Sequence, residues 1–502
     1  MRRDALAAFG IGLASFLLMA LFAATEFTWV FRSGDASDFL AASTWWYVGH
    51  VEGFPTYMLL GHALNLLPGA MPMKLALLLA VLPSAATVSL VYWWLRQNGV
   101  ARDLCIIASL SVIASSIVWT QSLLQMQYTL TMFLGFLGFY LWSRGHRYWA
   151  ATPLALAIGV HFLGLFFAGT CVLWDWWRSR REEFLPWSTD RWSWVRPAAL
   201  TLGLTLALYS MIPILMLWPG IPRWIAGPLV LWDPSTWRNL YDYLFEAQGF
   251  VGGLPVAQLP ERTWHLFGIL LVAWGPLWIP TVYGAVRMWR SSSLALILLP
   301  LAPIVMWWTF LDTATWTWMV VSFPLLALLL VAGLQALPRW HTHVAGGMVA
   351  LLLVVNMVTL PVGAIARADG RATTFLSELE ALPQDSIVMV MESDLSTTLA
   401  YHLASTPGRR LVPFISPKYE RYAWHRAWVE GEYGLRSVSE RSIGVALGRS
   451  RGEKTDVAPM LREVLEDGRP LYLMGYPGIT NVLEACFWDK KGDYTYRIKR
   501  CE

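Results

Sequence analysis

The chain has 502 residues, of which 56% are hydrophobic and only 14% are charged, and it contains 30 tryptophans. Soluble domains carry about 25% charged residues, so this composition excludes an ordinary soluble protein and indicates a membrane protein with several spans. The net charge of +4 is small and comes without a dense lysine and arginine tract, which argues against a nucleic-acid partner. The four cysteines lie far apart and do not form a zinc-binding pattern.

Long apolar runs separated by polar loops predict the membrane spans. We expect the first at residues 5–25, as an uncleaved span whose basic start, Arg2-Arg3, lies in the cytoplasm. Two apolar pieces, 148–160 and 162–174, are each shorter than the roughly 20 residues of a straight span, and they form either a re-entrant pair or two short spans. Further spans are expected at residues 73–95, 104–120, 126–142, 198–217, 265–286, 294–310, 316–334 and 344–362. With the short pair counted as two, the fold class is an α-helical membrane protein with about 11 spans.

The distribution of arginines predicts the orientation. Threading the spans places most arginines on one side, including the cluster between Arg178 and Arg196, and the opposite loops hold few basic residues. Cytoplasmic loops carry the excess of basic residues. We therefore expect a multi-pass protein of the plasma or inner membrane, with the loop around Asp35, the loop at 218–264 and the C-terminal tail outside the cytoplasm.

From about residue 367 the composition becomes that of a soluble protein. Runs at 386–391 and 470–474 predict short buried strands, and 458–465 predicts an amphipathic helix. Two domains follow: a membrane-embedded domain at 1–366 and a small extracytoplasmic α/β domain at 367–502. Cys486 and Cys501 are the only cysteines of the second domain and would pair in an oxidising compartment.

The polar segment between the first two spans is the first candidate for chemistry. It carries Asp35, Asp38, His50 and Glu52 among aromatic and small residues. An ionisable group held against a membrane-embedded fold is by default a hypothesis for a functional site. The alternative is an ordinary solvated loop.

Other polar residues recur at the outer side or within membrane segments. They are Gln121, Tyr128, His161, Asp233 and Arg238. Polar groups at membrane depth are costly, so they tend to face a cavity or each other. Structural alternatives stay open for these residues. Residues 121–128 could form a plain interfacial turn, and His161 could be a hydrogen-bonded core histidine. Arg238 could pair with Asp242, one helical turn further along the chain.

Several short motifs resemble the transmembrane protein 260 family. They are Gly34-Asp35-Ala36-Ser37-Asp38, Gly53-Phe54-Pro55, Trp119-Thr120-Gln121 with Tyr128-Thr129-Leu130, Gly159-Val160-His161 and Trp232-Asp233-Pro234. They keep the family's order over about residues 25–250. The C-terminal half resembles the family only in layout.

The resemblance implies a type-C glycosyltransferase fold, whose enzymes take sugars from polyprenyl-phosphate donors at the outer membrane face. Family members of eukaryotes are protein O-mannosyltransferases, so the implied acceptor is a hydroxyl of a protein, a glycan or a lipid. In type-C enzymes an acid of the first outer loop is catalytic, and Asp35 takes that place as the general base of an inverting transfer, with Asp38 beside it. The substrate-binding residues would be His50, Glu52, Gln121, Tyr128, His161, Asp233 and Arg238.

Three positions depart from the family pattern. Met126 stands where the family has an acid, Asp38 stands where it has a glutamate, and His50 is not followed by two prolines. The departures point to a different acceptor, a lost metal site or an inactive relative. No cofactor is certain, and a divalent metal remains possible. Two other functions remain: a flippase for a lipid-linked sugar, which would need broken helices in two repeated halves that the sequence does not show, and a non-catalytic membrane scaffold, in which Asp35 would be dispensable.

Overall fold

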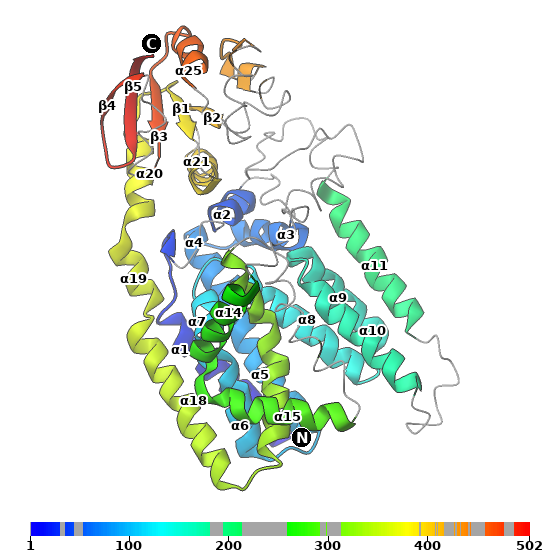
Figure 1. The fold of residues 1–502 in the computed structure, drawn as a ribbon. Coiled ribbons are helices and arrows are strands. Elements are labelled where there is room, and N and C mark those ends of the chain that lie inside the picture. The colour runs from blue at the N-terminus through cyan, green and yellow to red at the C-terminus, as the bar shows by residue number, and fades with distance from the viewer. Residues whose placement is uncertain are drawn as a thin grey trace.

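A computed structural model gives the arrangement of a helical membrane part and a small sheet at the C-terminal end (Figure 1). The structure describes residues 2–30, 36–44, 54–180, 194–212, 259–291, 298, 313–390, 393–406, 408, 410–415, 426, 429–431, 433–439, 442, 457–475 and 486–501. Helices α2 and α3 lie at the end of the molecule that carries the sheet, and the N-terminus lies at the opposite end (Figure 1).

The described residues of the first half of the chain are mostly helical. The elements are α1 (Arg2–Ala20), α2 (Ala36–Thr44), α3 (Pro55–Ala63), the 3₁₀ turn η2 (Leu64–Leu66), α4 (Met71–Lys74), the π-helical segment η3 (Leu75–Val81), α5 (Leu82–Gln97), α6 (Arg102–Ala114), α7 (Ser116–Ser122), α8 (Tyr128–Ser143), α9 (Arg147–Val160), α10 (Gly164–Arg180) and α11 (Val195–Tyr209).

The second half of the chain adds further helices to the membrane part and then connects it to the C-terminal sheet. Its helices are α14 (Leu259–Trp274), the 3₁₀ turn η6 (Gly275–Leu277), α15 (Trp278–Ser291), the 3₁₀ segment η7 (Thr313–Ser322), α17 (Phe323–Leu334), α18 (Trp340–Thr359), α19 (Val362–Asp369) and α20 (Arg371–Ala381). The last three run one after another along the side of the molecule up to the sheet (Figure 1).

Five helical stretches in the described part of the chain are long and apolar enough to cross a membrane. They are Arg2–Ala20, Met71–Gln97, Pro260–Trp289, Thr317–Leu334 and Trp340–Ala381, and the bent pair of α6 and α7 would be a sixth. These helices confirm the helical membrane character expected from the sequence, but they do not confirm the predicted total of about 11 crossings. The predicted span at 294–310 lies almost wholly outside the described residues.

The predicted span at 104–120 is a broken helix rather than a straight one. α6 and α7 meet at Ser115 with a bend of 65°. A break at membrane depth leaves backbone carbonyls without helical partners, which must be satisfied by the protein. Asn356 of α18 donates a hydrogen bond to the Ala114 carbonyl at 2.9 Å, and Trp274 of α14 donates one to the Ser111 carbonyl at 2.7 Å. Side chains from distant segments therefore stabilise the break.

The C-terminal region forms a five-stranded sheet in the order β2-β1-β3-β5-β4. Its elements are β1 (Ile387–Val390), α21 (Ser393–Ser405), β2 (Val412–Ile415), α25 (Ala458–Leu465), β3 (Leu471–Met474), β4 (Cys486–Lys490) and β5 (Thr495–Cys501). The first three strands of that order are parallel, and β5 and β4 are antiparallel to their neighbours. Both strands and the helix predicted from the sequence are present, within a residue at each end.

The two faces of this sheet pack against different cores. Side chains alternate between the faces of a strand. Ile387 and Met389 of β1 belong to a core of the sheet and α25. Val388 and Val390 belong to the core that runs through the membrane helices. The apolar interior is therefore continuous from the membrane part into the C-terminal domain.

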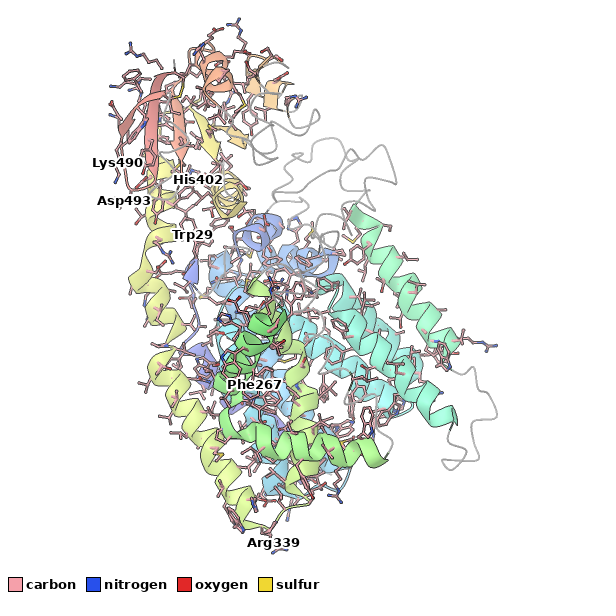
Figure 2. All side chains as sticks on the ribbon, viewed as in Figure 1. Trp29, Phe267, Arg339, His402, Lys490 and Asp493 are labelled. Atoms are coloured by element: carbon pink, nitrogen blue, oxygen red, sulfur yellow. A yellow bond between two sulfur atoms is a disulfide. The ribbon has the colours of Figure 1, made fainter. Side chains whose placement is uncertain are left out.

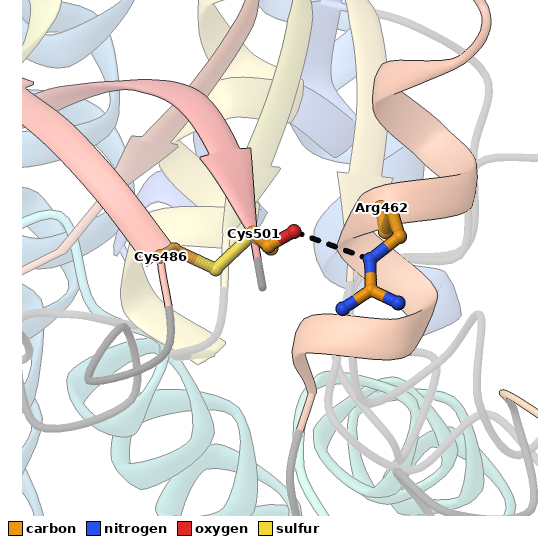
Figure 3. Close-up of a disulfide and its surroundings, with 3 residues drawn as sticks. All are labelled: Arg462, Cys486 and Cys501. Atoms are coloured by element: carbon orange, nitrogen blue, oxygen red, sulfur yellow. Dashed lines mark hydrogen bonds between the residues drawn. A yellow bond between two sulfur atoms is a disulfide. The ribbon is translucent and has the colours of Figure 1, made fainter.

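A disulfide joins Cys486 of β4 to Cys501 of β5 (Figure 3). The two residues are directly opposite each other in the strand register. Arg462 of α25 donates a hydrogen bond to the Cys501 carbonyl at 3.1 Å (Figure 3). The pairing predicted from the sequence is confirmed, and it ties the edge strand to the end of the chain.

Candidate functional site

The helix α2 carries one of the two predicted catalytic acids, Asp38, in its first turn. All of its residues from Ala36 to Ser43 are buried, and Asp38 is only 2% exposed. The first turn of a helix has a positive electrostatic potential, which stabilises a carboxylate there. Five other predicted site residues lie outside the described residues: Asp35, which directly precedes α2, and His50, Glu52, Asp233 and Arg238.

The helices α2 and α3 pack against each other as a hairpin. Gly61 of α3 allows the close approach, because a Cβ at this position would lie 2.0 Å from the Ser43 hydroxyl. The His62 ring donates a hydrogen bond from Nδ1 to the Ser43 carbonyl at 2.7 Å, and the Asn65 amide donates to the same carbonyl at 2.7 Å. Burial lowers the pKa of His62, and the hydrogen bond to Ser43 opposes part of this shift.

Phe54 links this hairpin to the rest of the site. Its backbone is left-handed, with φ 38° and ψ 56°, which is costly for a residue with a large side chain. The ring packs 5.4 Å from the Phe39 ring of α2 and stacks 5.4 Å from the His161 ring at an interplanar angle of 16°. These contacts hold the strained residue in place, and through it they connect the acid-bearing helix with His161.

His161 lies in the turn between α9 and α10. Its backbone is extended, and the tightness of the turn requires Gly164, whose Cβ would lie 2.4 Å from the Ile158 backbone nitrogen. The Leu163 amide donates a hydrogen bond to His161 Nδ1 at 3.2 Å, so a neutral ring carries its proton on Nε2. His161 is thus a buried histidine with one ring nitrogen held by the backbone and the other protonated.

Tyr128, the first residue of α8, belongs to the same cluster. Its ring centroid lies 5.3 Å from that of His161, and Trp318 of η7 lies 6.1 Å from His161 on another side. Tyr128 and His161 are 6% and 2% exposed. The structure therefore brings together two of the predicted substrate-binding residues, and aromatic rings connect them to α2.

Gln121 lies in α7, the second helix of the broken span, and Gln125 follows this helix; both are fully buried. Gln125 donates hydrogen bonds to the carbonyls of Ala24 at 2.6 Å and Glu26 at 3.1 Å. Among the described residues, neither the amide nitrogen nor the amide oxygen of Gln121 finds a hydrogen-bond partner, whereas Gln125 leaves only its amide oxygen unpaired. The helix α7 packs against η7, the segment that supplies Trp318 to the His161 cluster. Gln121 is thus a buried amide with its full hydrogen-bonding capacity unused.

The sequence does not single out two further features, a buried lysine and a cavity. Lys74 is buried at the end of α4, where its ammonium group donates to the carbonyls of Leu64 at 2.9 Å and Leu67 at 3.0 Å. A cavity of about 520 Å³ lies between α7 and α14. It is lined by Ser116, Ile117, Trp264, His265, Gly268, Ile269 and Val272. Hydropathy alone shows that such segments are apolar but not which of them leave a space between them.

Whether the site could bind a divalent metal ion depends on how many carboxylate groups it contains. Met126, at the position of the family's second acid, is buried and offers no oxygen ligand. Within the described residues, no three side chains of His, Cys, Asp or Glu converge on a point that a metal ion could occupy. Asp38 by itself would supply one carboxylate ligand. The described side chains therefore do not form a metal site without further ligands.

Neither a protein-family model nor a curated protein sequence matches this chain. Solved structures, by contrast, do match it. The crystal structure of ArnT from Cupriavidus metallidurans, bound to undecaprenyl phosphate, has a TM-score of 0.61 and 11% identity over 98% of this chain and 97% of ArnT. The oligosaccharyltransferase of Archaeoglobus fulgidus, tethered to an acceptor peptide, has a TM-score of 0.50 and 10% identity over 99% of this chain and 74% of its own. The chain therefore shares its fold with membrane glycosyltransferases, as the family resemblance implied, whereas none of these comparisons confirms the transmembrane protein 260 family itself.

Proposed function

We propose that this protein is a membrane glycosyltransferase that moves a sugar from a polyprenyl-phosphate donor to a hydroxyl acceptor at the outer membrane face. The observation that carries the proposal is the shared fold, which extends over nearly the whole length of this chain and of ArnT. The motifs that resemble the transmembrane protein 260 family support a protein O-mannosyltransferase-like activity, with a protein, glycan or lipid hydroxyl as the acceptor. The fold does not itself decide the sugar or the acceptor.

Asp35 would act as the general base. A hydroxyl is a weak nucleophile, and a carboxylate that accepts its proton promotes attack on the anomeric carbon. The new bond joins the acceptor oxygen to that carbon, while the bond from carbon to the phosphate oxygen breaks and its electron pair leaves with the phosphate. Attack opposite to the leaving group inverts the anomeric configuration. Asp38, one helical turn along, would orient the acceptor or hold the sugar.

The remaining residues would bind the substrates. His161 Nε2 and the Tyr128 hydroxyl are suited to the hydroxyl groups of a sugar, since both can donate hydrogen bonds. Gln121 can donate and accept, which suits a pair of neighbouring sugar hydroxyls. His50, Glu52 and Asp233 would complete the sugar and acceptor sites. Arg238 would bind the donor phosphate, because a guanidinium group can hold two phosphate oxygens at once.

The apolar tail of the donor needs an apolar surface at the outer half of the membrane. The cavity between α7 and α14 would provide one, since Trp264 and Ile269 are among its lining residues. Burial of an isoprenoid chain there would be favoured by about 0.8 kcal/mol per buried CH₂.

Transfer by the purified protein, with and without Asp35, tests this proposal. With a panel of polyprenyl-phosphate sugars, we expect the wild type to transfer at least one of them, and Asp35→Asn to be about 10²–10⁴-fold slower while it remains folded. Asp493→Asn is a matched control, because this carboxylate is 75% exposed in the C-terminal domain. Near-normal turnover by Asp35→Asn would overturn the assignment of the base. Absence of transfer from every donor would favour the flippase or scaffold instead.

A further inference from the structure

Trp29 lies at the junction between the membrane part and the C-terminal domain (Figure 2). Its indole nitrogen donates a hydrogen bond to the Thr398 hydroxyl of α21 at 3.2 Å. Its ring packs 5.5 Å from the Phe375 ring of α20 and 6.0 Å, edge to face, from that of Tyr494. Trp29 belongs to the segment that leads from α1 to α2, so this segment is anchored in the C-terminal domain.

Ser37 makes a second connection, within α2 itself. Its hydroxyl is hydrogen-bonded to the hydroxyl of Thr397, the neighbour of Thr398 on α21, and both residues are buried. The two partners are 360 positions apart in the chain. In the sequence, Ser37 stands between Asp35 and Asp38. A buried bond at this point restricts the rotation of α2 about its own axis, because rotation of the helix would break the bond.

Apolar packing reinforces both hydrogen bonds. Leu395 and Leu399 of α21 belong to the same buried core as Phe39 and Leu40 of α2. α21 connects β1 to β2, so it is held in turn by the sheet. The acid-bearing helix is therefore packed between the membrane body and α21 of the C-terminal domain (Figure 1).

We propose that the C-terminal domain positions α2, and with it the catalytic carboxylates, through Trp29, Ser37, Thr397 and Thr398, which we call the α2 clamp. The inference rests on the proposed function, because the clamp affects catalysis only if the acids at α2 are catalytic. None of the four residues needs to touch a substrate, so they are positioning residues. Such residues act on the chemical step, because a misplacement of about 1 Å at the reacting groups can cost about 10²-fold in rate.

The first test removes the two threonine hydroxyls together, as Thr397→Val with Thr398→Val in the full chain. We expect kcat to fall by about 10–10²-fold and the KM for the donor to stay within about twofold. Thr397→Ser with Thr398→Ser keeps both hydroxyls and should restore kcat. Thr373→Val is the control, because this exposed threonine of α20 bonds only the Gly370 carbonyl of its own turn. Equal kcat in the valine and serine pairs would overturn the clamp.

The second test does not depend on activity. In the valine pair, amide hydrogen exchange of residues 36–44 should be faster than in the wild type, and that of α8 should not change. In the variant Ser37→Cys with Thr397→Cys, the two side chains that touch in the wild type should form a disulfide on mild oxidation, and the cross-linked protein should retain kcat. Failure to cross-link, or unchanged exchange in α2, would overturn the proposal. A wild-type chain that transfers no sugar would instead overturn the proposed function, because exchange and cross-linking report on the clamp separately.

Discussion

Gln121 and Gln125 are four residues apart and equally buried, but within the described residues only Gln125 uses its amide nitrogen in hydrogen bonds. A buried polar group without a partner costs about 1–3 kcal/mol. Gln121→Leu removes two such atoms while keeping most of the volume, so we expect thermal unfolding of the substrate-free protein to shift to a higher temperature. If Gln121 binds a sugar, the same variant should show a severalfold higher KM for the donor.

Gln125→Leu provides the contrast for this experiment. It would leave the buried carbonyl of Ala24 without the hydrogen bond it accepts at 2.6 Å. We expect a loss of about 1–2 kcal/mol and a lower unfolding temperature. A Gln121→Leu protein that is less stable than the wild type would show that the amide has a structural role. An unchanged KM would remove Gln121 from the substrate site.

His62 predicts a pH dependence at the α2–α3 hairpin. Its pKa is lowered in the folded protein, mainly by burial, while an unfolded histidine titrates near 6.5. The unfolded chain therefore takes up the proton first as the pH falls. The stability that neutral His62 provides is complete above about pH 6.5 and is lost as the pH falls from there towards the folded pKa.

The measurement is the unfolding temperature between pH 7.5 and pH 5 for the wild type and His62→Gln, which keeps a donor for the Ser43 carbonyl. We expect a smaller decrease in the variant. His343→Gln, at an exposed histidine of α18, should follow the wild type. Parallel curves for all three proteins would show that His62 does not contribute to the acid sensitivity.

The helices α15 and α17 cross so closely that their glycines lie against the backbone of the opposing helix. A Cβ on Gly284 would lie 2.0 Å from the Leu329 carbonyl oxygen, and one on Gly333 would lie 1.8 Å from that of Pro280. Small residues let membrane helices approach to backbone contact. Because the opposing atoms are backbone, Gly333→Ala must push the helices apart, and we expect a loss of about 1–3 kcal/mol.

Gly268→Ala on α14 is the matched control for the crossing. A Cβ there would have no heavy atom within 4 Å. Alanine favours a helix over glycine by about 1 kcal/mol, so this variant should be neutral or slightly stabilised. Thermal unfolding in the same detergent compares the two. Equal stability of both alanine variants would mean that α15 and α17 do not cross at these glycines.

The sequence predicts where the helices lie along the chain better than it predicts where they bend. Apolar runs predict the continuous helical stretch Met71–Gln97, which comprises α4, η3 and α5, and the helix α18 within a few residues, because a membrane span needs an unbroken apolar stretch. The break at Ser115 has no such signal. It depends on Trp274 and Asn356, which lie far along the chain and accommodate the free carbonyls only after folding.

For the whole molecule, composition predicts the change of character near residue 367 but not the packing across it. The contact between α2 and α21 joins distant segments through hydroxyl groups and leucines that are unremarkable in the sequence. Likewise, the sequence singles out Asp38 in a polar segment between two spans and Tyr128 and His161 as polar residues near or within spans, whereas Phe54 stands out there only as part of a motif. Its strained backbone and its stack on His161 are properties of the fold.

The two ends of the molecule differ in their basic residues, and this difference predicts the orientation in the membrane. α2, α3 and the C-terminal sheet lie at one end of the molecule, and the N-terminus and Arg339 lie at the other (Figures 1 and 2). Arg96 of α5 pairs with Asp4 of α1 at 2.9 Å, so two basic helix ends share that second end. Because basic residues are retained in the cytoplasm, we expect the end with Arg339 to be cytoplasmic and the end with the sheet to be extracytoplasmic.

Two fusions of a reporter that is active only in the cytoplasm measure this. The fusion after Glu502 should be silent, and the fusion in the turn between α17 and α18, next to Arg339, should be active. The second fusion controls for expression, so a silent first fusion is meaningful. The reverse pattern would place α2 and the α2 clamp in the cytoplasm, where a donor carried at the outer membrane face could not reach Asp35.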